Sequence, residues 1–264
     1  MVPGETPANA DYPWDEFDPV SYLAHNYSEL REDDRKILTF VRDFLASASI
    51  SLADRSQMRG IDIGTGPNLY PALAMLPFCA DITLYEFSKS NVDWLEQQHA
   101  AAWPSWAGMW QQFWAVLCED PTYARFDRPH MNAVLSLSTR VVHGNVFDLI
   151  CSPDEQYDIG TMFFGPESLS PRRSEFSAAL DHLLDALTPN APFAVAFMEH
   201  SAGYDVGETF FPATNISVED VNDYLKTRTR DVRIERVGTG KEPLRSGYSG
   251  MIVACGRTPR RAGS

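Results

Sequence analysis

The sequence predicts one doubly wound α/β domain, in which helices cover both faces of a mostly parallel sheet. Short apolar runs alternate along the chain with amphipathic segments of helical period. One of these runs, residues 60–63, ends in the glycine turn Gly64-Thr65-Gly66, which is typical of a buried strand that leads into a helix. No internal repeat or interdomain linker divides the 264 residues. We therefore expect a single domain.

The expected elements follow in order. A first helix is indicated by apolar residues at 37, 40, 41, 44 and 45, which is the spacing of one buried helix face. The strands are expected at residues 60–63, 81–85, 140–145, 157–164, 193–198, 231–237 and 250–255, and further helices at 68–76, 103–117 and 170–187. The last helix should begin at Ser217, because Ser217 and Asp220 have the spacing of a capping box.

Composition excludes several kinds of function. The formal net charge is −14, so the surface repels phosphate backbones and nucleic acid is not an expected partner. The four cysteines form no CxxC pair and the six histidines show no HxxxH or HExxH spacing, so we expect buried thiols and no metal site. The sequence shows neither a signal segment nor an apolar run of membrane-spanning length, which favours a cytoplasmic protein without a membrane partner.

The glycine turn predicts a cofactor that contains adenosine. Gly64 and Gly66 lack a Cβ, so the backbone can approach a ligand closely. Glu86 follows Gly66 by twenty residues and ends the second expected strand. A carboxylate at this point can accept hydrogen bonds from both hydroxyls of a ribose.

The residues around the turn favour S-adenosylmethionine over NAD, FAD or ATP. A dinucleotide fingerprint needs a third glycine three residues after the second, where this chain has Leu69. Asp62 lies two residues before the first glycine, where its carboxylate would repel a pyrophosphate and suit the ammonium group of S-adenosylmethionine.

A longer set of motifs resembles one methyltransferase family over roughly residues 14–256. The matching residues are Phe17-Asp18-Pro19 with Tyr22, Leu23 and Tyr27, then 61–67 with Tyr70, Glu86-Phe87-Ser88 with Asn91, Asn145-Val146, and Gly207-Glu208. In this set and order the sequence resembles the family of small-molecule methyltransferases that contains nicotinamide N-methyltransferase, phenylethanolamine N-methyltransferase and thioether S-methyltransferase. The resemblance implies a Rossmann-like class I methyltransferase with a seven-stranded, mostly parallel sheet and an antiparallel last strand. It also implies an N-terminal helical cover over residues 1–55 and a core over 56–257. The residues 258–264 are small and basic, so we expect a flexible tail there.

The resemblance also implies roles for single residues. Tyr22 and Tyr27 would close over the cofactor, and Gly64, Thr65 and Gly66 would face its methionine part together with Asp62. Glu86 would hold the ribose, Asn91 would lie close to the adenosine, and Asn145 and Val146 would bind the adenine. Met162 and Phe163 would lie under the transferring centre.

The acceptor site is where the chain departs from the family. Asn26 stands where the family often has a tyrosine, and residues 199–204 differ from those of relatives with known substrates. Glu199, at the end of the fifth strand, is our candidate for contact with the acceptor, with Tyr204 and Asp205 behind it. The alternative is that Glu199 and His200 only pair at a loop. The tryptophans of 103–117, among them Trp110 and Trp114, either pack a helix onto the domain or also wall the substrate pocket.

The predicted function is transfer of a methyl group from S-adenosyl-L-methionine to a small molecule, with S-adenosyl-L-homocysteine as the product. On family grounds the nitrogen of an amine or heteroaromatic compound is the leading acceptor. Methylation of O, S or C in a small aromatic compound is the runner-up. Two further hypotheses are a non-catalytic module that binds the cofactor and an NAD-dependent oxidoreductase. The protein should be a monomer or a homodimer.

Overall fold

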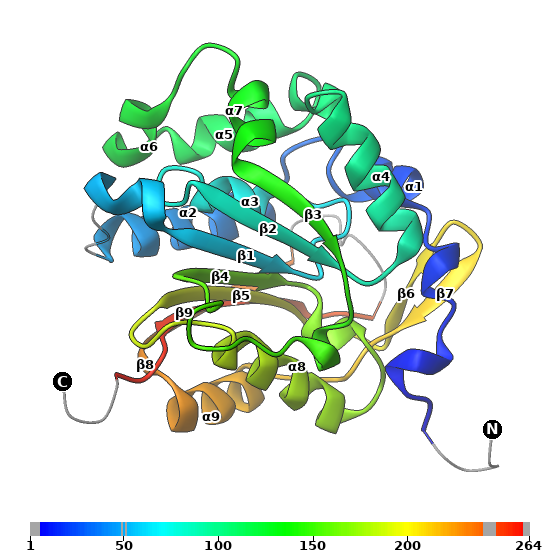
Figure 1. Cartoon of the computed structure of the whole chain (residues 1–264). Helices are drawn as coiled ribbons and strands as arrows, with labels where there is room; N and C mark the ends of the chain where they lie inside the picture. The colour runs from blue at the N-terminus through cyan, green and yellow to red at the C-terminus, as the bar shows by residue number, and fades with distance from the viewer. Residues whose placement is uncertain (1–5, 49, 51, 240–246, 261–264) are drawn as a thin grey trace.

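The computed structural model describes residues 6–48, 50, 52–239 and 247–260 and is built around a seven-stranded sheet of order β3-β2-β1-β4-β5-β9-β8 (Figure 1). The strands are β1 (Arg59–Ile63), β2 (Asp81–Glu86), β3 (Thr139–His143), β4 (Ile159–Phe163), β5 (Pro192–Glu199), β8 (Arg230–Gly238) and β9 (Gly250–Arg257). Neighbours from β3 to β5 pair in parallel, whereas β9 is antiparallel to both β5 and β8. The predicted fold class, including the antiparallel last strand, is confirmed.

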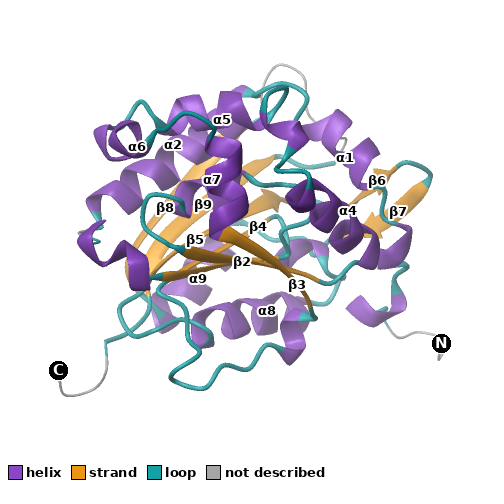
Figure 2. Ribbon diagram, turned by 45° about the horizontal axis from the view of Figure 1, so that its top comes forward, coloured by secondary structure: helices purple, strands orange, loops and turns teal. Residues whose placement is uncertain are grey.

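Helices cover both faces of this sheet (Figure 2). Their bounds are α1 (Pro19–Asn26), α2 (Glu32–Ser47), α3 (Tyr70–Met75), α4 (Lys89–Ala100), α5 (Trp110–Leu117), α6 (Pro121–Phe126), α7 (Met131–Ser138), α8 (Arg173–Asp185) and α9 (Val218–Arg228). One buried cluster joins α2, α3 and α5 to the sheet, and a second joins α8 and α9 to its opposite face. The sheet is therefore buried on both sides, which parallel strands require.

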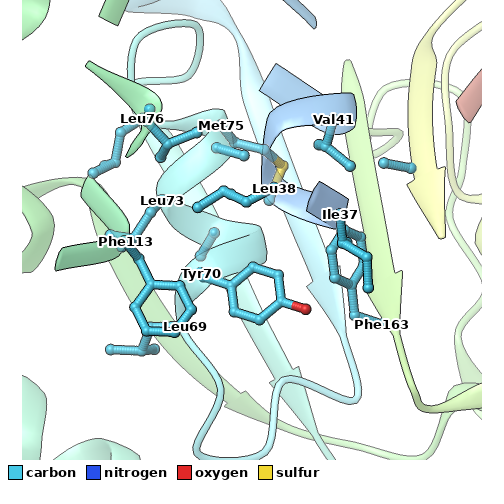
Figure 3. Close-up of a cluster of buried hydrophobic side chains, with 14 of the residues drawn as sticks. Ile37, Leu38, Val41, Leu69, Tyr70, Leu73, Met75, Leu76, Phe113 and Phe163 are labelled. Carbon is cyan, nitrogen blue, oxygen red and sulfur yellow. The ribbon is translucent and has the colours of Figure 1, made fainter. Parts of the chain in front are cut away.

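The predicted apolar face of α2 packs against α3. Figure 3 shows Ile37, Leu38 and Val41 facing Leu73 and Met75, and all five side chains are fully buried. Glu32 and Asp33 lie in the first turn of α2, where carboxylates stabilise the positive end of the helix dipole. Because α3 follows the glycine turn, this packing fixes the turn against the end of β1.

The prediction of a single helix over 103–117 is wrong. Ala102 and Trp103 have φ values of 54° and 55°, in the left-handed region that ends a helix, and the 3-10 turn Pro104–Trp106 separates α4 from α5. The chain also contains a hairpin that we did not predict, made of β6 (Gly203–Val206) and β7 (Thr209–Pro212). It lies outside the seven-stranded sheet, beyond the carboxyl ends of the central strands and beside the N-terminal segment (Figure 1).

The C-terminal tail is ordered at its start. Thr258, where we expected fraying to begin, is 3% exposed, and its hydroxyl donates to the Thr188 carbonyl at 2.7 Å. Residues 261–264 of the predicted tail and residues 1–5 of the predicted cover lie outside the described part of the chain. In the part that is described, no helix is both long enough and apolar enough to cross a membrane.

Candidate functional site

A cavity of about 830 Å³, measured out to its open mouth, lies at the carboxyl ends of the central parallel strands. The position is where the strand order reverses between β1 and β4, which is where open α/β sheets bind ligands. Its walls come from the loops after β1 to β4, from the N-terminal segment and from the hairpin. They include Asn9, Trp14, Phe17, Tyr22, 63–68, 85–88, Asn91, 144–146, 162–165, Ser168, Leu169 and Tyr204.

The turn after β1 has a backbone that favours glycine. Gly64 has φ +65° and Gly66 has φ +52°, and side chains raise the energy of this conformation. The amide of Gly64 donates to the Tyr85 carbonyl at 2.8 Å, which ties the turn to the end of β2. The turn is thereby held as part of the cavity floor.

Glu86 lies in a cradle of backbone amides at the end of β2. Its Oε2 accepts from the Gly66 amide at 2.7 Å, and its Oε1 accepts from the amides of Phe87 at 2.9 Å and Ser88 at 2.7 Å. Burial raises the pKa of Glu86, while these amides act in the opposite direction. Together with the Asn91 side chain, these amides hold the carboxylate in the cavity wall.

Two further buried oxygens at this end have no hydrogen-bond partner among the described residues: Oδ1 of Asn91 and Oδ2 of Asp62. The other carboxylate oxygen of Asp62 accepts from the Thr161 hydroxyl at 2.7 Å. Burial raises the pKa of Asp62 to about 7, and no ion pair of Asp62 occurs in the described part of the structure. A bound cation or hydrogen-bond donor would therefore stabilise it. This set of hydrogen-bond acceptors fits a cofactor with an adenosyl group and a cationic end.

An N-terminal strap, which we define as residues 9–17, crosses one side of the cavity. The Ser88 hydroxyl donates to the Trp14 carbonyl and the Ser90 hydroxyl to the Phe17 carbonyl, both at 2.7 Å. The strap meets the hairpin through aromatic rings, since Trp14 stacks on Phe211 with ring centroids 5.0 Å apart. The cavity therefore has an aromatic cover made of two segments far apart in sequence.

Most of the predicted cofactor residues lie in the cavity wall. These are Tyr22, Gly64, Thr65, Gly66, Glu86, Asn91, Asn145, Val146 and Met162, and the predicted acceptor residues Phe163 and Tyr204 join them. Tyr27 lies behind Tyr22, with ring centroids 6.0 Å apart, and is 3% exposed. Asp62 is directly below the turn.

The other predicted acceptor residues are not in the cavity wall. Trp110 and Trp114 are buried in the cluster under α2 and α3, which agrees with the alternative that this helix packs on the domain. Asn26 donates from its amide to the Tyr22 carbonyl at 2.7 Å. Asp205 is exposed on the hairpin strand β6.

Glu199 is engaged by two partners. Its Oε2 accepts from Nε of Arg236 at 2.7 Å and from the Ser249 hydroxyl at 2.6 Å. His200 contacts the same Ser249 hydroxyl through Nδ1 at 2.8 Å. Glu199 and His200 are thus linked through Ser249 in a network that ties β5 to the two antiparallel strands.

The structure brings residues to the site that we did not predict. Asn9, Trp14 and Phe164 line the cavity, and only Trp14 had a signal, in an aromatic stretch too apolar for a loose tail. Glu167 is fully buried beside the cavity residue Ser168, and its Oε1 accepts from the Met198 amide at 2.8 Å. This contact holds the end of β5 against the loop after β4, and no local sequence pattern predicts it.

Comparisons with known proteins agree with this geometry. The model of the NNMT/PNMT/TEMT family matches residues 6–254. Human phenylethanolamine N-methyltransferase is 27% identical over 248 residues, which are 88% of this chain and 84% of the relative. The Macaca mulatta enzyme of the same name is 27% identical over 230 residues, which are 82% of this chain and 79% of that relative.

Solved structures share the fold at lower identity. A putative sarcosine dimethylglycine methyltransferase from Galdieria sulphuraria aligns with a TM-score of 0.54 and 12% identity, over 88% of each chain. An S-adenosylmethionine-dependent methyltransferase from Clostridium acetobutylicum aligns with a TM-score of 0.54 and 10% identity, over 92% of this chain and 100% of the other.

Proposed function

We propose that this chain, which belongs to the NNMT/PNMT/TEMT family, transfers the methyl group of S-adenosylmethionine to the nitrogen of a small amine or heteroaromatic compound. The chain is an S-adenosylmethionine-dependent methyltransferase, so the proposal concerns the acceptor and the residues that serve it. One observation carries it: the cavity combines hydrogen-bond acceptors for an adenosyl group with an aromatic wall of Trp14, Phe17, Tyr22 and Tyr204. Aromatic faces attract cations, and the net charge of −14 attracts them toward the surface.

The residues proposed to hold the cofactor divide by its parts. Glu86 would accept the ribose hydroxyls, Asn91 would lie beside the adenosine, and Asn145 and Val146 would bind the adenine. The turn from Gly64 to Gly66 would lie along the methionine part, with Asp62 below it and Tyr22 and Tyr27 on the cover side. Met162 and Phe163 would form the floor at the reacting end.

When bound, the cofactor supplies a methyl group that its positive sulfur already makes electrophilic. The task of the protein is to hold the acceptor nitrogen in line with that group and to exclude water. Correct orientation of two reactants can lower a barrier by about 7–11 kcal/mol. An amine must also be neutral when it attacks, so a nearby acceptor must take its proton.

Tyr204 is our candidate for the acceptor contact, because it lies in the cavity wall and stacks on Phe211 with ring centroids 5.7 Å apart. Glu199 is not among the residues that line the cavity, so for it we propose a supporting part behind the acceptor site. Glu199→Gln and Arg236→Gln break the same ion pair, but only the first removes the carboxylate. If the carboxylate serves the acceptor, Glu199→Gln lowers kcat more than Arg236→Gln at equal Tm. Equal kcat values for the two variants would remove Glu199 from the proposal.

The proposal is tested first by ligand binding and then by turnover. S-adenosylmethionine and S-adenosylhomocysteine should raise Tm and NAD should not, since a ligand that binds only the native state stabilises it. Formation of S-adenosylhomocysteine is then measured with matched amines, phenols and thiols. Turnover with phenols or thiols in place of amines would favour O- or S-methylation, and methylation at carbon would appear in the product mass and NMR spectra. Stabilisation by NAD alone would contradict the assignment of the site.

A further inference from the structure

The strap places a polar side chain inside the cavity. Asn9 is 3% exposed, lines the cavity wall, and has a side-chain Oδ1 without a hydrogen-bond partner in the residues that the structure describes. Its backbone is fully used, since its amide donates to Oε2 of Glu175 at 2.9 Å and its carbonyl accepts from the Trp14 indole at 2.9 Å. The backbone of Asn9 is thus held in place while its side-chain oxygen remains unpaired, and an unpaired buried polar atom is unfavourable.

Asn9 lies at the end of the cavity next to α8. Its partner Glu175 is in the first turn of α8 and also accepts from the Ser170 hydroxyl, close to the cavity residues Ser168 and Leu169. Helix α8 contacts the 3-10 turn Val146–Asp148, which begins at the cavity residue Val146. Figure 1 shows the blue N-terminal segment beside this end of the molecule, between α8 and the hairpin. Asn9 and Val146 therefore share the end of the site assigned to the adenine.

Without Asn9, the hydrogen-bonding groups at that end of the cavity match only part of those of an adenine ring. Glu86 is assigned to the ribose, and Oδ1 of Asn145 accepts from the Phe147 amide at 3.1 Å, which leaves it one lone pair for one N–H of the base. The exocyclic amino group of adenine has two N–H donors, which need acceptors when water is excluded. Asn9 has a buried oxygen with no other donor among the described residues.

We propose that Asn9 is a cofactor-binding residue, whose Oδ1 accepts a hydrogen bond from the exocyclic amino group of the adenine and so makes the strap part of the recognition of the base. The proposal rests on the assignment of the cavity to an adenosyl cofactor. It makes Asn9 a determinant of specificity for adenosine over inosine, because inosine carries a carbonyl oxygen in place of the amino group and two acceptors repel each other.

Isothermal titration calorimetry on the full chain tests this with two ligands, S-adenosylhomocysteine and its deaminated analogue S-inosylhomocysteine. The wild-type chain should prefer the first ligand. Asn9→Ala should raise the Kd of S-adenosylhomocysteine about 10-fold, the effect of one neutral hydrogen bond, and leave the Kd of S-inosylhomocysteine unchanged or lower. Asn9→Asp keeps an acceptor oxygen and should restore the preference. The ratio of the two Kd values is insensitive to partial unfolding, which affects both ligands equally.

Asp15→Ala is the matched control for the strap. It removes the hydrogen bond of Asp15 to the Lys89 amide, 2.9 Å long, and leaves Asn9 in place. It should change both Kd values equally. If Asn9→Ala also weakens both ligands equally, or weakens neither, Asn9 does not contact the amino group and the inference is wrong. If the wild-type chain binds neither ligand, the assignment of the cavity fails as well, so the two failures are distinguishable.

Discussion

The buried carboxyl group of Asp34 should control how stability depends on pH. Asp34 lies in the first turn of α2, is 2% exposed, and accepts a hydrogen bond from the Tyr70 hydroxyl at 3.2 Å. Burial and the neighbouring charge of Asp33 raise its pKa from 3.8 to about 8, while the bond from Tyr70 and the charge of Arg31 act in the opposite direction. The native protein therefore holds this proton at a pH where the unfolded chain has lost it.

The substitution Asp34→Asn isolates this effect, because asparagine keeps an acceptor for the Tyr70 hydroxyl and cannot ionise. The contribution of the protonated carboxyl to stability is complete below pH 3.8 and is lost as the pH rises toward 8. Between pH 5 and pH 9 the wild-type chain should thus lose about 4 kcal/mol relative to the variant, at about 1.4 kcal/mol per pKa unit. The variant should be the more stable protein at pH 9.

Urea denaturation followed by tryptophan fluorescence at pH 5, 7 and 9 measures this difference. The comparison of variant with wild type removes the pH dependence that arises from the rest of the net charge of −14. Asp154→Asn, at an exposed position, is the control and should give the same small change at each pH. A difference between Asp34→Asn and wild type that stays constant from pH 5 to pH 9 would refute the reasoning.

Three other predictions follow from local geometry. Glu86→Gln should raise the Kd of S-adenosylhomocysteine about 10- to 100-fold in calorimetry, because hydrogen bonds to charged groups contribute about 1.5–3 kcal/mol; an unchanged Kd would contradict the ribose assignment. Gly64→Ala should lower the free energy of unfolding by about 1–2 kcal/mol at φ +65°, whereas Gly108→Ala, where nothing lies within 4 Å of the added Cβ, should have little effect in the same denaturation. Phe211→Ala should remove about 3–5 kcal/mol, since this ring is fully buried; Phe210→Ala, at a 56% exposed ring, should lower Tm much less, and equal Tm losses would contradict the packing.

Local signals predicted the parts of the fold that depend on neighbouring residues. The capping box at the start of α9 is present as expected, with the Asp220 carboxylate accepting from the Ser217 amide at 2.9 Å. The glycine turn was identifiable because only glycine adopts positive φ readily. Both features are set within a few residues, so one stretch of sequence contains all the information.

Contacts between distant residues could not be predicted in this way. Glu199 and Arg236 are 37 residues apart, and Asn9 and Glu175 are 166 residues apart. The helix break at Trp103 could not be predicted for a different reason. The aromatic residues on both sides keep helical spacing, although the backbone turns there. This turn is held by a hydrogen bond from the Trp103 amide to the Gln98 carbonyl at 2.7 Å. Periodicity describes which residues are buried, and it does not show where the backbone changes direction.

The hairpin between β5 and α9 is structurally separate from the sheet that carries the glycine turn. It pairs with no strand of the seven-stranded sheet in the described structure, yet it contributes Tyr204 to the cavity. The exposed positions of the hairpin can therefore change while the register of the sheet and the turn after β1 stay the same. If Tyr204 contacts the acceptor as proposed, a chimaera that carries the hairpin of a relative is the natural starting point for redesigning acceptor choice.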